Sequence, residues 1–118
     1  MLKRIYTIHP KKRVALARLR MLRHSIGALP VVDKDNTLVG IITLRDIDLA
    51  GDRTYELTVE DLMTNNLITR RENTPLNEIA EIMVQTGLER IPITDNDNKL
   101  LGLITQSAVI KATKKLFK

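Results

Sequence analysis

The feature that most constrains this chain is an internal repeat with an offset of 62 residues. The stretch Pro30–Thr43 reads PVVDKDNTLVGIIT, and Pro92–Thr105 reads PITDNDNKLLGLIT, with eight identical positions among fourteen. This repeat is longer than the about 20 to 50 residues of solenoid units. The repeat length therefore favours two small units that pack against each other, and disfavours an extended array.

Each copy has the residue pattern of a hairpin that leads into a helix. Proline is expected to open a short β-branched strand, where its missing N–H is tolerated. Asp-x-Asp-Asn predicts a polar turn, and a second strand over Leu38–Ile42 contains Gly40, where another backbone or a ligand can approach closely. Thr43 is then expected to cap a helix that begins with Leu-Arg-Asp.

In the rest of the first half, the loose alternation of Leu2–Ile8 predicts a short strand, and the apolar spacing of Lys12–His24 predicts an amphipathic helix. Lys11, Lys12 and Arg13 crowd the start of that helix, where acidic residues are usual, so either solvent screens them or an anion lies nearby. Residues 50–55 look like a polar link.

In the second half, Thr58–Asp61 resembles a capping box for a short helix through Met63. Thr74 is expected to cap a further helix, with Pro75 at its first position and Gly87 after its end. A last helix is predicted from Gln106 to about Leu116.

Composition indicates a soluble globular protein in which aliphatic packing dominates. Of 118 residues, 43% are hydrophobic and 28% charged, with one Phe, two Tyr and no Trp. Each half is small for a core of its own, so the halves are expected to share one. The absence of Cys excludes disulfides and fits the cytosol. Because no apolar run approaches the about 18 residues of a membrane span and no signal peptide is visible, we expect a cytoplasmic protein without a membrane partner.

The net charge of +5 is unevenly distributed. All fourteen acids lie between Asp33 and Asp97, and the first 32 residues carry eight Lys and Arg. This asymmetry favours either an anionic partner or a solvated basic face.

The apolar-Pro-Val-Val-Asp hairpin that runs into Gly-Ile-Ile-Thr-Leu-Arg-Asp resembles the cystathionine β-synthase (CBS) domain. Two such copies resemble the tandem CBS pair, or Bateman module, and the likeness extends from about Ile5 to about Leu116. It also includes the Asp-Leu-Met-Thr sequence before the second copy. The resemblance implies an α+β fold of two β-α-β-β-α repeats, residues 1–55 and 56–118, packed about a pseudo-two-fold axis. Since the chain carries no effector domain, we expect a stand-alone CBS pair.

The resemblance also implies two ligand sites. In CBS domains the Asp of Thr-x-x-Asp typically holds both ribose hydroxyls of an adenosine ligand, while the Thr hydroxyl and the helix N-terminus face the phosphate. An ionised carboxylate suits this role because it accepts two hydrogen bonds. Each site would combine this element of one repeat with the first-strand Thr and the helix-to-strand junction of the other. Site one comprises Thr43, Arg45, Asp46, Thr69, Leu88, Glu89, Arg90, Ile91 and Pro92, and site two comprises Thr7, Lys12, Ile26, Gly27, Ala28, Thr105 and Ala108.

A purely structural alternative exists for Thr43 and Asp46, because Thr-x-x-Asp before a helix is itself close to a capping box. The second copy, Thr105-Gln-Ser-Ala108, keeps the Thr and lacks the Asp. Site two thus lacks the ribose acceptor, although it retains small residues and lies nearer the basic run.

Three hypotheses for function follow. The first is a sensor of adenosine-containing ligands, with AMP, ADP, ATP or S-adenosylmethionine as regulatory ligand and no required cofactor. The second is a nucleic-acid-binding module that uses the two basic ends, and the third is a structural dimerisation module with vestigial pockets. CBS pairs commonly dimerise, so a homodimer is expected. No enzyme and no metal site are expected, because His9 and His24 lack metal-ligand spacing and no catalytic motif is present.

Overall fold

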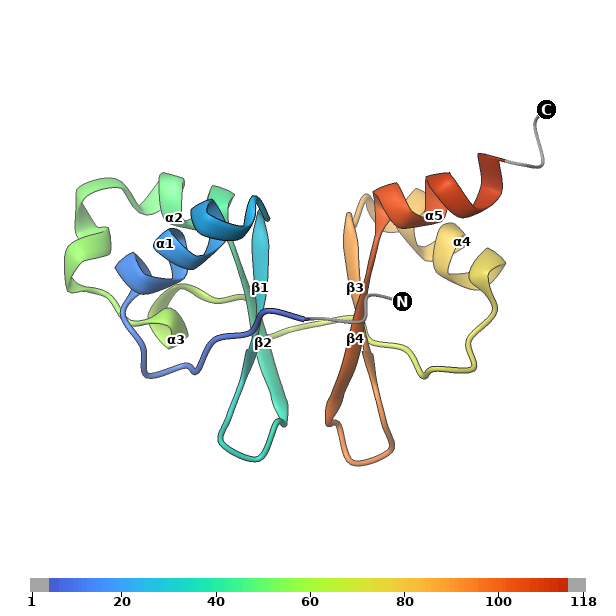
Figure 1. Ribbon diagram of the computed structural model, residues 1–118, viewed down its shortest axis with the longest axis horizontal. Helices are drawn as coiled ribbons and strands as arrows, with labels where there is room; N and C mark the ends of the chain where they lie inside the picture. Colours follow the sequence, from blue (N-terminus) through green and yellow to red (C-terminus); the bar gives the residue numbers. More distant parts are fainter. Residues whose placement is uncertain (1–4, 115–118) are drawn as a thin grey trace. The chain divides into compact units, whose positions relative to one another are not determined.

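The computed structural model describes residues 5–114. Helices and strands are both present, as expected for the α+β class, and each hairpin lies beside its own helices (Figure 1). In chain order the elements are α1 (Val14–His24), β1 (Ala28–Val32), β2 (Leu38–Thr43), α2 (Leu44–Ala50), the 3-10 helix η1 (Gly51–Glu56), α3 (Val59–Leu62), α4 (Leu76–Thr86), β3 (Arg90–Thr94), β4 (Leu100–Thr105) and α5 (Gln106–Thr113).

The chain forms two compact units, here called the first unit (Tyr6–Leu67) and the second unit (from Ile68 onward, together with Ile5). The boundary between the two units lies after Leu67, later in the sequence than the repeat boundary that was expected after residue 55. The reason is that α3 packs on the first unit, where Val59 is fully buried. The N–H of Val59 also donates to the carbonyl of Lys12 at 2.8 Å.

The two hairpins have the same geometry, 62 residues apart. β1 pairs antiparallel with β2, with Ala28 opposite Thr43, and β3 pairs with β4, with Arg90 opposite Thr105. The sequence predicted that Pro30 opens the strand, and this was wrong: Pro30 is the third residue of β1. Its carbonyl accepts from the N–H of Ile8 at 3.1 Å, so the missing N–H faces that edge and not β2.

The polar turn of the first hairpin is closed by the side chain of Asp33. Its Oδ1 accepts from the N–H groups of Asp35 at 2.9 Å and Thr37 at 3.0 Å. Asn36 takes the left-handed conformation, φ 65°, that Asn tolerates better than most residues. The Asp33 carboxylate therefore has a structural role in the turn. The second hairpin repeats the arrangement with Asp95, Asp97, Asn98 and Lys99.

The strand expected over Leu2–Ile8 is reduced to one residue among those described. Ile8 forms a parallel bridge with Val31, and Arg70 forms the equivalent bridge with Ile93. Ile5–Thr7 are not in a strand, and residues 2–4 lie outside the described part of the chain. The hairpin of the first unit thus has one bridge on each edge, at Ile8 and at Thr64, whereas among the described residues the hairpin of the second unit has the bridge at Arg70.

α2 and α5 begin at Leu44 and Gln106 as predicted, whereas α1 and α4 begin two residues and one residue later than predicted. α1 begins at Val14 because Arg13 is extended and bridges Thr58. The predicted cap Thr74 was wrong: Pro75 is the N-cap of α4, and the N–H of Thr74 instead closes a turn onto Arg71 at 3.1 Å. At the other end of α4, the left-handed Gly87 terminates the helix as predicted. The last predicted helix, α5, is described as far as Thr113.

Each unit has its own cluster of buried aliphatic side chains between its hairpin and its helices. In the first unit, Met21 of α1 packs with Leu29, Ile42 and other residues. In the second unit, Ile79 and Met83 of α4 pack with residues of β3 and α5. A core shared by the two halves stays a prediction.

Candidate functional site

The predicted Thr-x-x-Asp element lies where β2 passes directly into α2. Thr43 Oγ1 accepts from the N–H of Asp46 at 3.1 Å, and Asp46 Oδ2 accepts from the N–H of Thr43 at 3.2 Å. These two bonds form a reciprocal capping box, as the structural alternative predicted. Asp46 Oδ1 has no hydrogen bond to any residue between 5 and 114 and remains an available acceptor. Capping by one oxygen is therefore compatible with ligand binding by the other.

The second copy keeps only half of this arrangement. Thr105 Oγ1 accepts from the N–H of Ala108 at 3.2 Å, so the cap survives at the start of α5. Ala108 provides no carboxylate to complete the box or to hold a sugar. Helix α5 forms nonetheless, which shows that this fold does not require the acid.

Each unit brings its Thr-x-x element next to its own helix-to-strand junction. The carbonyl of Gly27 accepts from the N–H of Leu44 at 2.8 Å, and the carbonyl of Glu89 accepts from that of Gln106 at 2.7 Å. Within the first unit, the Thr-x-x-Asp part of predicted site one therefore lies beside the Gly27 part of predicted site two. Within the second unit, the Thr105 part of site two lies beside the Glu89 part of site one. The predicted combination of Thr43, Arg45 and Asp46 with Thr69 and residues 88–92 involves two separate units and stays a prediction.

The remaining predicted residues are distributed around these elements. The carbonyls of Thr7 and Thr69 accept from the guanidinium groups of Arg20 and Arg70, respectively. The side chains of Lys12 and Arg45 are exposed. At the basic start of α1, Lys11 pairs with Glu60 at 2.8 Å, which raises the pKa of Lys11, and Arg13 donates to the carbonyl of Tyr55.

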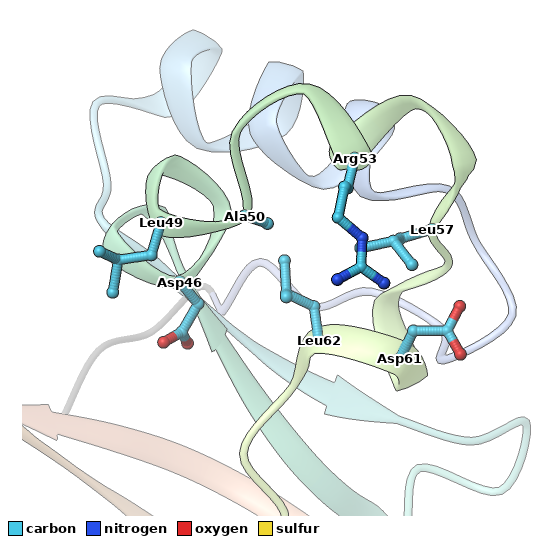
Figure 2. A pocket seen from close by; sticks show the side chains of 7 residues that line it. All are labelled: Asp46, Leu49, Ala50, Arg53, Leu57, Asp61 and Leu62. Atoms are coloured by element: carbon cyan, nitrogen blue, oxygen red, sulfur yellow. The ribbon is translucent and has the colours of Figure 1, made fainter.

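A cavity of about 440 Å³ lies beside Asp46 within the first unit. Its lining comes from α2, η1 and α3, and its charged side chains are Asp46, Arg53 and Asp61 (Figure 2). This volume falls in the range of small-molecule sites, about 300 to 1,000 Å³. The apolar part of the lining consists of Leu49, Ala50, Leu57 and Leu62.

Sequence reasoning did not find this cavity, because it assigned residues 50–55 to a polar link. Residues 51–55 of that stretch belong to η1, which follows α2 at Gly51, where φ is 60°. The spacing gave no reliable signal, because Arg53 follows Asp46 by seven residues but Gly51 interrupts the helix between them. Asp61 was identified only as a capping residue.

Asp61 is held in its ionised form by its own helix cap. The N–H and the hydroxyl of Thr58 both donate to Asp61 Oδ2 at 2.9 Å, and these hydrogen bonds lower the pKa of Asp61. The predicted capping box of α3 is therefore confirmed. The charged part of the cavity lining thus consists of two acidic side chains and one guanidinium group.

Within residues 5–114 no group of three or more His, Cys, Asp or Glu side chains is arranged to hold a metal ion. No described helix is long and apolar enough to cross a bilayer.

The sequence matches the CBS domain family over residues 1–51 and 59–115, so the chain belongs to this family. Two consecutive matches define a CBS pair. Inosine-5'-monophosphate dehydrogenases are among its relatives: that of Methanocaldococcus jannaschii is 38% identical over 113 residues, and that of Aquifex aeolicus 38% over 109 residues. These matches cover 96% and 92% of this chain and 22% of each enzyme, so the chain spans about a fifth of their length.

Solved structures of CBS pairs share the fold. CBSX2 in complex with AMP superposes with a TM-score of 0.87 at 28% identity, over 98% of this chain and 92% of CBSX2. The CBS pair of MJ0100, in complex with 5'-methylthioadenosine and S-adenosyl-L-methionine, gives 0.88 at 29% identity, over 98% and 93%. The resemblance seen in the sequence and the α+β fold are thereby confirmed.

Proposed function

We propose that this chain is a regulatory CBS pair that binds an adenosine-containing ligand at Asp46, without catalysis. The observation that carries this proposal is the carboxylate of Asp46, which lines a cavity and keeps one oxygen unbonded in the described chain. A carboxylate in that state accepts the hydroxyls of a ribose. Support comes from two relatives of the same fold whose structures contain AMP or S-adenosylmethionine and 5'-methylthioadenosine.

The second repeat contributes the rest of the site in this proposal, through Thr69 and residues 88–92. A site at Thr105 and Ala108 would bind adenosine more weakly, because no carboxylate stands at position 108. Asp46 therefore makes the two repeats unequal, and we propose one ligand per chain at low ligand concentration.

Regulation requires that the ligand bind one state of the protein better than another. A CBS pair has no reaction of its own in this proposal, and its output is a change in shape or assembly that a partner detects. A homodimer is the assembly that we propose. The site would lie in the cytoplasm, where adenine nucleotides are abundant.

The rival role in nucleic-acid binding gains nothing from the structure. Lys11 and Arg13 are bonded to Glu60 and to the carbonyl of Tyr55, so part of the basic run is already occupied. The described chain also contributes only one aromatic stack, between Tyr6 and His24.

A thermal-shift screen tests the proposal. The chain is heated with adenosine, AMP, ADP, ATP or S-adenosylmethionine, each at 1 mM, and with GMP as a control for the base. The proposal predicts that at least one adenosine compound raises Tm and that GMP does not. Equal shifts with GMP and AMP, or no shift with any compound, would contradict it.

A further inference from the structure

The two repeats expose apolar side chains on equivalent helices. Leu19 and Leu22 of α1 are 52% and 56% exposed, although both are large aliphatic residues. In α4, Val84 stands 62 positions after Leu22 and is 82% exposed, and Ile110 of the neighbouring α5 is 61% exposed. Single exposed apolar residues are common on soluble proteins, whereas apolar residues exposed on equivalent helices of both repeats indicate a contact surface.

The exposed apolar residues of α1 lie on the side of the helix that faces away from the core. Val14, Ala17 and Met21 are fully buried, and their spacing defines the side that packs on the first unit. Leu19 and Leu22 fall on the other side at helical spacing. α1 and α4 each lie on one side of their own hairpin (Figure 1). Each helix thus has one side that its own unit covers and one side that it leaves exposed.

The charges on these two helices are opposite in sign. α1 contains three arginines and no acidic residue, whereas α4 contains two glutamates and no basic residue. Some of these charges are already paired: Arg18 pairs with Asp48 at 3.0 Å, and Glu78 pairs with Arg70 at 3.2 Å. The guanidinium of Arg20 donates to the carbonyl of Thr7.

Arg23 and Glu81 are the charges of α1 and α4 that form no ion pair within residues 5–114. Glu81 accepts a hydrogen bond from the neutral side chain of Gln85 at 2.8 Å and keeps its negative charge for a partner. Arg23 lies one turn after Leu19, and Glu81 lies one turn before Val84. Each helix therefore presents an apolar side chain beside one charge, with opposite signs on the two helices.

This charge pattern decides which surface of a second copy suits α1. Contact between two copies of α1 would bring arginines together. The neighbouring helix α2 offers no unpaired acid, because Asp48 pairs with Arg18 and Asp46 caps its own helix. Helix α4 of a second copy offers both an apolar side chain and an acid. Opposite charges favour association, whereas like charges in contact cost several kcal/mol.

We propose that α1 of one copy of this chain packs against α4 of a second copy, with Leu22 against Val84 and Arg23 beside Glu81. The contact forms twice about a two-fold axis, since each copy then contributes both surfaces. This assignment rests on the proposed function, in which the assembly is a homodimer. It specifies the surface and the orientation of that homodimer: the first repeat of each copy faces the second repeat of its partner.

Cysteine cross-linking tests the orientation. The chain contains no Cys, so Leu22→Cys and Val84→Cys each introduce a single thiol. Each variant is produced alone, and the two are also co-expressed, before oxidation and electrophoresis without reductant. A cross-linked dimer is expected in the co-expressed sample and is expected to be lost in either variant alone, because identical thiols would lie at separate contacts.

Charge exchange tests the pairing of Arg23 with Glu81 by analytical ultracentrifugation. Glu81→Arg should raise the dimer Kd about tenfold or more, because it places two guanidinium groups together at both contacts. Arg23→Glu should have the same effect, and the double variant should return Kd to near that of the parent. Glu72→Arg is the matched control: it makes the same change in net charge in the turn before α4 and should leave Kd unchanged. Thermal unfolding checks that each variant is folded.

The outcomes separate this assignment from the proposed function. Cross-linking of Leu22→Cys with itself would show that the first repeats face each other, which overturns the orientation and leaves the homodimer intact. A double variant that dimerises no better than the single variants would refute the charge pairing. A parent that stays monomeric by light scattering at high micromolar concentration would overturn both the surface and the homodimer, and another occupant would then cover α1. Ligand binding at Asp46 is measured independently by the thermal-shift screen.

Discussion

Gly40 offers a sharp test of how the first unit is assembled. It lies in β2, beside the segment that leaves α3, and Ile41 and Thr64 exchange two backbone hydrogen bonds there, at 2.9 and 2.8 Å. A Cβ at Gly40 would lie 2.6 Å from Met63 Sδ and 2.9 Å from the carbonyl oxygen of Thr64. The side chain of Met63 can move, but the backbone of Thr64 cannot move without straining the two hydrogen bonds.

Gly40→Ala is therefore expected to destabilise the protein by about 2 to 4 kcal/mol, the sum of an overpacked contact and a weakened backbone pair. Urea denaturation followed by circular dichroism measures this change. Gly87→Ala is the matched control, because Gly87 has φ 76° and open space around its Cβ position. It should cost about 1 kcal/mol from backbone strain alone.

Adding Met63→Ala to Gly40→Ala should recover only part of the loss, because the contact with the Thr64 carbonyl remains. A Gly40→Ala variant as stable as the parent would refute the account, since it would show that residues 63–64 do not pack closely on β2.

Three further predictions concern stability. Ala108→Asp should complete the capping box of α5 and raise the free energy of unfolding by about 0.5 to 1 kcal/mol in urea melts, whereas an unchanged midpoint would show that the box contributes nothing there. The capping contribution of Asp61 is present above about pH 4 and is lost as pH falls through its lowered pKa, so the Tm difference between parent and Asp61→Asn should shrink from pH 6 to pH 3; a constant difference would contradict this. If the halves share a core, the parent should unfold in one calorimetric transition, and two resolved transitions would assign separate stability to the units.

The local structure of the hairpins was predictable because its signals lie within a few residues of each other. The Asp-x-Asp-Asn turn, the Thr43 cap and the terminating Gly87 each act through their own side chain or backbone. The repeat showed the hairpin pattern a second time, and the two hairpins indeed have the same strand register. The two capping boxes, at Thr43 and Thr58, were visible for the same reason.

The errors arose where distant parts of the chain decide the outcome. Pro30 stands inside β1 because its missing N–H faces an edge residue, Ile8, which sequence spacing cannot show. The cavity beside Asp46 depends on α3 folding back onto the first unit, next to η1. Arg53 looked like one charge in a polar link, and its position in the cavity became apparent only with that packing.

The most direct test of the central claim compares AMP and S-adenosylmethionine binding to the parent and to Asp46→Ala by calorimetry. The variant loses a charge-assisted pair of hydrogen bonds to ribose, so affinity should fall by about 2 to 3 kcal/mol, or about 30- to 150-fold. Stability should fall by only about 1 kcal/mol, since Thr105 shows that the hydroxyl cap alone supports the equivalent helix. Asp46→Glu is the control that keeps a carboxylate for the cap. The account is contradicted if Asp46→Ala binds these ligands as tightly as the parent, or if the parent binds neither at millimolar concentration.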